Sequence, residues 1–139
     1  MQTVFEEAPL WSVLASATQL LENDPEEAER QALAALKVAP GQSQALQLLV
    51  SAKRVLGNLA GARATLEAMA AETPNLANLH YEIGLLLMET GEADAAIRSL
   101  SRVMELEPEH TFAPRALADA LVQAGDVEGA ASAYTKQFT

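Results

Sequence analysis

Apolar residues recur along this chain at the three- and four-residue spacing of one helix face, in segments that glycines and prolines separate. Residues 77–110 show the pattern most clearly, because Leu79, Ile83 and Leu86 fall on one face of a helix. A glycine then breaks the pattern, a second amphipathic segment follows, and Pro108 ends it, since proline cannot continue the backbone hydrogen bonds of a helix. The segment therefore predicts two helices joined by a glycine turn.

The same arrangement returns along the chain with a period of 34 residues. Three residue types keep this period, each at its own place in the repeat: Pro40, Pro74 and Pro108; Gly57, Gly91 and Gly125; Ala28, Ala62, Ala96 and Ala130. Agreement between three independent residue types indicates an internal repeat of helix–turn–helix units. In its period and helix pattern the chain resembles the tetratricopeptide repeat family over nearly its whole length. The resemblance implies an all-α fold, a right-handed α-solenoid of about four repeats.

The repeats are expected to follow a short N-terminal extension. We place the extension at residues 1–8 and the array at 9–139, with repeats at about 9–42, 43–76, 77–110 and 111–139. In the first repeat, Asp24 is a good N-cap for a helix that begins at Pro25, and Glu27 can complete a capping box. In the second repeat, Gly61 lies inside a helix, which predicts close packing at that point.

The end of the array leaves two interpretations open. No further helix covers the last repeat, so we expect a fragment of a longer protein or an end that docks onto another copy. Trp11, Tyr134 and Phe138 would leave apolar surface partly bare, and end-to-end self-assembly is therefore one functional hypothesis. Residues 117–138, LADALVQAGDVEGAASAYTKQF, also resemble the closing repeat that precedes a sulfotransferase domain in some bacterial proteins. This weaker resemblance implies a region that recruits a protein substrate for such an enzyme.

Composition narrows the classes of function. The net charge of −10 repels phosphates and anionic lipids, so neither nucleic acid nor a membrane is an expected partner. The absence of cysteine and of a long apolar run predicts no disulfide and no membrane span, and favours a cytoplasmic location. We expect His80 to be packed or at an edge and His110 to be solvated in a loop, without a metal site. The acidic clusters lie at helix ends and loops, so we expect no catalytic residues, no cofactor and no enzymatic activity in this segment.

The leading hypothesis is a protein-binding module. In the resembled family, the first helices of the repeats line a concave groove that holds an extended peptide or a partner helix. The helical period projects thirteen side chains onto this side: Gln47, Ser51, Arg54, Asn78, Tyr81, Glu82, Leu85, Met88, Glu89, Phe112, Arg115, Asp119 and Gln123. The alternative for each is ordinary solvated or packing surface. Tyr81, Met88 and Phe112 are the preferred apolar contacts, because aromatic residues give a large contact area at low entropy cost.

Charge gives this groove an expected partner. Three acids stand against two arginines among the thirteen residues, which favours a peptide of basic or mixed charge. One well-known subgroup of the family binds C-terminal carboxylates through a clamp of lysine, asparagine and arginine. This chain has Val13 and Ala17 where that clamp needs its lysine and its asparagine, so the clamp function is not expected.

Overall fold

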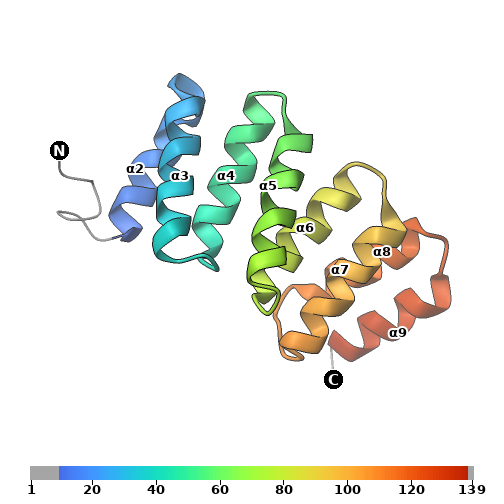
Figure 1. Cartoon of the computed structure of the whole chain (residues 1–139). Helices are drawn as coiled ribbons and strands as arrows, with labels where there is room; N and C mark the ends of the chain where they lie inside the picture. The colour runs from blue at the N-terminus through green and yellow to red at the C-terminus, as the bar shows by residue number, and fades with distance from the viewer. Residues whose placement is uncertain (1–9, 138–139) are drawn as a thin grey trace. The chain divides into compact units, whose positions relative to one another are not determined.

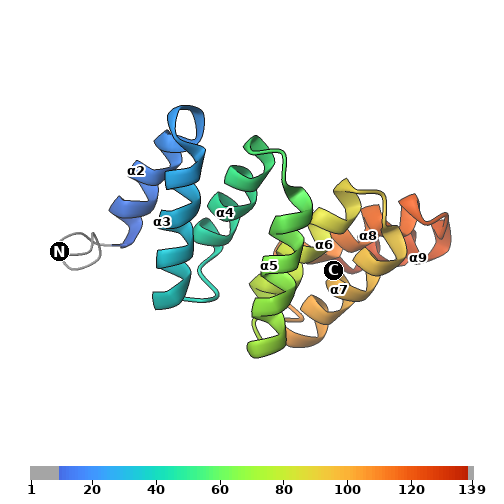
Figure 2. The same cartoon turned by 45° about the horizontal axis from the view of Figure 1, so that its top comes forward.

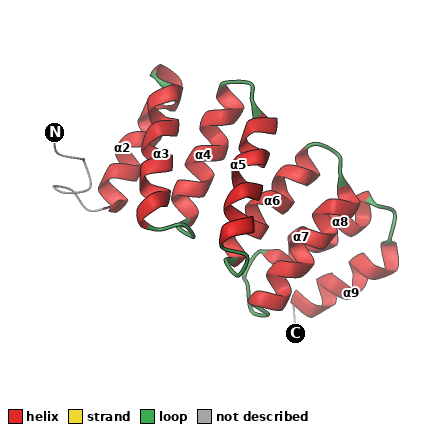
Figure 3. Cartoon of the chain, viewed as in Figure 1, coloured by secondary structure: helices red, strands yellow, loops and turns green. Residues whose placement is uncertain are grey.

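The computed structural model describes residues 10–137, and this part of the chain folds into eight α-helices without a strand (Figure 1, Figure 3). In chain order they are α2 (Leu10–Asn23), α3 (Pro25–Val38), α4 (Ser43–Val55), α5 (Leu59–Glu72), α6 (Ala77–Glu89), α7 (Ala93–Leu106), α8 (Ala113–Gln123) and α9 (Val127–Gln137). The residues up to Thr65 form one compact unit and those from Leu66 onward form a second, so the boundary falls within α5. Among the described helices, none is both long and apolar enough to cross a membrane.

In the first unit, α2, α3 and α4 pack against one another (Figure 2). The packing face of α3 combines the buried Leu36 with small side chains, and Ala28, Ala32 and Ala35 have no exposed surface. Leu46 and Leu49 of α4 are also fully buried. Because alanine adds only a methyl group, the neighbouring helices can approach closely, and the larger leucines supply most of the buried apolar area.

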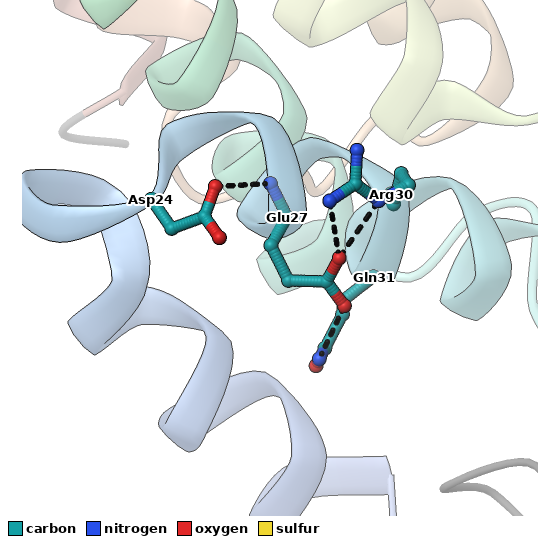
Figure 4. Close-up of polar contacts among 4 residues, drawn as sticks. All are labelled: Asp24, Glu27, Arg30 and Gln31. Carbon is teal, nitrogen blue, oxygen red and sulfur yellow. Dashed lines mark hydrogen bonds and ion pairs between the residues drawn. The ribbon is translucent and has the colours of Figure 1, made fainter.

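The start of α3 combines an N-cap with a side-chain network (Figure 4). The Asp24 Oδ1 atom accepts a hydrogen bond from the Glu27 N–H at 3.2 Å, as predicted. The Glu27 carboxylate accepts hydrogen bonds from the Gln31 side chain at 3.2 Å and from the Arg30 side chain at 2.7 Å. These two bonds lower the pKa of Glu27. The second half of the predicted capping box, a hydrogen bond from the Asp24 N–H to the Glu27 carboxylate, is wrong, because this N–H already donates to the Leu20 carbonyl at 2.7 Å.

In the second unit, α6 packs on α7 and α8, α7 packs on α8, and α8 packs on α9 (Figure 2). Gly84 of α6 is buried against Leu100 of α7, and a Cβ atom there would lie 2.8 Å from the Leu100 side chain. Leu100 itself has no exposed surface. The two helices therefore approach more closely than any side chain at position 84 would allow.

The turns inside the repeats depend on glycine and on short polar caps. Gly57, Gly91 and Gly125 have φ angles of 73°, 80° and 88°, the left-handed region in which side chains are strained. Asn58 Oδ1 then accepts from the Gly61 N–H at 2.9 Å and caps α5. A Cβ atom at Gly61 would collide with this Asn58 side chain. The predicted close packing at Gly61 is therefore confirmed, and the group packed there is the Asn58 side chain that caps the helix.

Candidate functional site

A groove in the second unit lies between α6 and α8, the first helices of the predicted third and fourth repeats. Its lining consists of Tyr81, Leu85, Thr111, Phe112, Arg115, Ala116 and Asp119, and its volume is about 330 Å³. Five of these seven residues were predicted from the helical period. We call this the α6/α8 groove.

The late start of α8 places Phe112 at the edge of this groove. Ala77, the first residue of α6, plus the 34-residue period gives position 111, yet α8 begins at Ala113. Pro114 explains the delay, because its missing N–H and its ring are tolerated only in the first turn of a helix. Phe112 consequently occupies the N-cap position, and 63% of its surface is exposed. Pro114 accordingly lies in the first turn of α8.

Three aromatic rings gather at this end of the groove. The ring centroid of His110 lies 4.9 Å from that of Tyr81, with a tilt of 39°, and 6.3 Å from that of Phe112 in an edge-on arrangement. His110 Nδ1 also accepts hydrogen bonds from the N–H groups of Phe112, at 3.2 Å, and Ala113, at 3.0 Å. His110 lies in a loop, as predicted, but its side chain is half-buried and caps α8 instead of only facing solvent.

A signal for this cap was present in the repeat period. His110 follows Gln42 by 68 residues, which is two periods of 34. Gln42 is the N-cap of α4, and its Oε1 atom accepts from the Ala45 N–H at 2.7 Å. The two side chains therefore both cap a helix at the same position of the repeat, although one is an amide and the other an imidazole.

Tyr81 is held firmly in the groove wall. It packs against the buried Ala77, Val103 and Ala113. Burial, and then the neighbouring Glu82 carboxylate, raise the pKa of the Tyr81 phenol above its ordinary value. The hydroxyl is therefore a neutral donor at physiological pH. Glu82 is only 6% exposed, so it lies inside the unit and not on the groove side to which the helical period assigned it.

A wider pocket of about 660 Å³ adjoins the α6/α8 groove on the side of the loop after α7. Its lining consists of Asn78 and the run Glu107, Pro108, Glu109, His110, Thr111 and Phe112. Thr111 and Phe112 line both spaces, so the pocket and the groove meet at these two residues. Of this lining, Asn78 and Phe112 were predicted. The exposed carboxylates of Glu107 and Glu109 add negative charge beside the Phe112 ring.

The first unit has a groove of its own between α2 and α4. Its lining consists of Leu14, Ala15, Thr18, Leu21, Gln44, Gln47, Leu48 and Ser51, and its volume is about 430 Å³. Only Gln47 and Ser51 were predicted here. The residues on α2 were missed, although Leu14, Thr18 and Leu21 have the i, i+4, i+7 spacing of one helix face. We call this the α2/α4 groove. The two clamp positions are buried, with Val13 5% and Ala17 0% exposed.

The other predicted residues lie outside these spaces. Arg54, Glu89 and Gln123 are exposed and Met88 is half-buried, and none of the four lines either groove or the adjoining pocket. The side chains of Trp11, Tyr134 and Phe138 lie outside the described residues, so self-assembly through them stays a prediction. His80 is half-buried and donates from Nε2 to the Pro74 carbonyl at 2.7 Å. Within the described part of the chain, no cluster of acids and histidines is arranged to hold a metal ion.

Known proteins share this architecture. A family model described as tetratricopeptide repeat matches residues 20–77 and 81–137. The crystal structure of MamA protein superposes with a TM-score of 0.67 at 19% identity, covering 93% of this chain and 71% of that chain. MamA 41-end from Desulfovibrio magneticus RS-1 gives a TM-score of 0.68 at 22% identity, covering 96% and 76%. No curated protein sequence matches the chain. The predicted all-α solenoid fold is confirmed, whereas the likeness to sulfotransferase-associated repeats is not shown by these matches.

Proposed function

The chain belongs to the tetratricopeptide repeat family, and from this premise we propose that it is a non-catalytic module that binds an extended peptide of a protein partner. The proposed site is the α6/α8 groove together with the pocket that adjoins it. A role in protein–protein interaction follows from the family in general. The groove, its contact residues and the charge of the partner are specific to this proposal.

The observation that carries the proposal is the convergence of predicted contact residues from two separate helices. Tyr81 and Leu85 of α6 line the same groove as Phe112, Arg115 and Asp119 from the start of α8. Phe112 exposes most of a large apolar ring there, and burying such a ring against a ligand contributes a large contact area. Truncation of an aromatic contact at a peptide groove typically costs about 2 kcal/mol, or about thirtyfold in affinity.

The charges around Phe112 support a partner of basic or mixed charge. Three carboxylates, those of Glu107, Glu109 and Asp119, line the groove and the adjoining pocket, against the single guanidinium of Arg115. A lysine or arginine of the ligand would meet carboxylates there and could rest on the face of the Phe112 ring. The Arg115 guanidinium could pair with one acidic group of the same ligand.

Selection from a random-peptide display library against the whole chain tests this proposal. We expect the selected peptides to combine basic and apolar residues, and to lose about thirtyfold in affinity for Phe112→Ala. Val122→Ala is the matched control, because Val122 is another apolar residue of α8 with 54% exposure, outside both spaces. Circular dichroism would verify that both variants keep the helical signal. Equal loss in the two variants, or selected peptides that are predominantly acidic, would contradict the proposal.

A further inference from the structure

The first turn of α8 is held by a side chain that can gain a proton. The N–H groups at a helix start lack partners within the helix. Here Pro114 has no N–H, Ala116 donates to the Phe112 carbonyl at 3.1 Å, and the N–H groups of Phe112 and Ala113 both donate to His110 Nδ1. The imidazole therefore caps this helix where an Asp, Asn or Ser side chain would ordinarily do so.

This cap exists only for the neutral imidazole. A nitrogen that accepts two hydrogen bonds carries no proton, which places the ring proton on Nε2. In the cationic form both ring nitrogens are donors, so Nδ1–H would point at the two N–H groups that it now accepts from. A positive charge is also unfavourable at the N-terminus of a helix, where the helix dipole is positive.

We propose that His110 makes the α6/α8 groove sensitive to protons: the neutral imidazole fixes the start of α8 and the Phe112 ring, and protonation releases both. The proposal concerns regulation of the binding site and in that respect rests on the proposed function. The test spans about pH 8 to about pH 5, the range over which histidine side chains in general gain a proton.

The surroundings of His110 contain other groups that titrate or carry charge. Tyr81 of α6 contacts the ring, and its phenol is uncharged over this pH range. Glu107 and Glu109, in the loop after α7, line the same pocket. Arg115 and Asp119 of α8 line the groove on the other side of Phe112. The carboxylates can attract the freed imidazolium away from the helix start, which favours the release of the cap.

Two substitutions of His110 distinguish the effect of its protonation from the effect of its aromatic ring. His110→Gln supplies a neutral acceptor that does not titrate, and glutamine already caps α4 at the equivalent repeat position through Gln42. His110→Phe keeps an aromatic ring beside Tyr81 but removes the acceptor at every pH. His80→Gln is the matched control for the second histidine, which donates to the Pro74 carbonyl and lines neither the α6/α8 groove nor the adjoining pocket.

The measurement is hydrogen exchange of the Phe112, Ala113 and Ala116 amides by NMR on the whole unliganded chain, with rates corrected for the intrinsic effect of pH. For the native sequence and for His80→Gln, we expect protection of these amides to fall about fivefold as the pH is lowered from about 8 to about 5. The ring resonances of Phe112 should shift over the same range.

The two His110 variants complete the test. His110→Gln should keep its protection across the range, and His110→Phe should lack it throughout. A native pH profile that coincides with that of His110→Gln would overturn the proposal, as would a change in protection that leaves the Phe112 ring resonances unmoved. Because no ligand is used, the proton switch can fail while the peptide site stands, and the peptide site can fail in the display experiment while the switch stands.

Discussion

The two grooves of this chain have the same origin in the repeat and opposite chemistry. The α2/α4 groove is lined by leucine, alanine, glutamine, serine and threonine, with no charged and no aromatic residue among its eight lining residues. The α6/α8 groove is lined by two aromatic rings, an arginine and an aspartate among its seven. One helical scaffold therefore presents a neutral surface in one unit and a charged aromatic surface in the other.

Under the proposed function, we expect this difference to give the second unit the selectivity for a ligand. Amide and hydroxyl groups such as those of Gln47 and Ser51 can bond to any peptide backbone, so they discriminate little between sequences. Charged and aromatic side chains discriminate between ligands, because a wrong charge or a missing apolar group leaves them desolvated without compensation. We therefore propose that the α6/α8 groove is the site of recognition, and we expect no sequence preference of the α2/α4 groove.

The largest expected effect concerns the packing that positions α6. The first unit has Val50 one period before Gly84, and both positions are buried. Gly84→Val would transfer the residue of the first unit into the second, where its Cβ would meet the fully buried Leu100. We expect a loss of about 1–3 kcal/mol in the free energy of unfolding, measured by urea denaturation. A midpoint equal to that of the parent would show that α6 and α7 do not approach as closely as described.

A smaller effect is expected from removing the negative charge beside Phe112. Glu107→Gln together with Glu109→Gln should weaken a selected basic peptide about three- to tenfold, because each exposed charge pair is worth at most about 1 kcal/mol. Its binding should also depend less on salt. Glu22→Gln with Glu26→Gln is the matched control, since it makes the same change in net charge on exposed residues of the first unit. Equal weakening by both pairs would attribute the effect to net charge and not to the pocket.

The smallest effect concerns the carboxylate network at the start of α3. Hydrogen bonds from Gln31 and Arg30 lower the pKa of Glu27, so the folded chain binds fewer protons at this group than the unfolded chain. Its contribution to stability is therefore present above the ordinary glutamate pKa and is lost as the pH falls through the lowered value. Glu27→Gln should lower the denaturation midpoint slightly at about pH 7, and the difference should vanish towards about pH 3. A difference that is constant over this range would mean that the charge of Glu27 is not involved.

The 34-residue period predicted the helices and much of the α6/α8 groove, because each repeat places the same helix faces at the same positions. The inner faces marked by Ala28, Ala62, Ala96 and Ala130 are all buried, since each repeat buries the same face. The predicted start of α3 at Pro25 agrees with the structure. The turn glycines fall at equal spacing for the same reason.

Departures from the period were harder to predict. Each departure depends on which of several neighbouring groups a polar side chain hydrogen-bonds to in the folded chain. Glu27 has a capping-box position by sequence, but Arg30 and Gln31 lie one turn ahead and the Asp24 amide is already bonded. His110 follows a proline in a loop, and only the delayed start of α8 brings two amides to its Nδ1 atom. The period marks the position of the His110 cap through Gln42, but it does not specify which amides a polar group contacts.

The most direct test of the central claim is to map where a selected peptide binds. The backbone amide resonances of the whole chain would be followed by NMR while a basic peptide from the display selection is added. We expect the largest shifts on the residues around Tyr81, Leu85, Phe112, Arg115 and Asp119, and we expect Tyr81→Ala with Phe112→Ala to abolish them. Shifts concentrated on α7 and α9, or shifts that survive the double substitution, would place the interaction elsewhere and contradict the account.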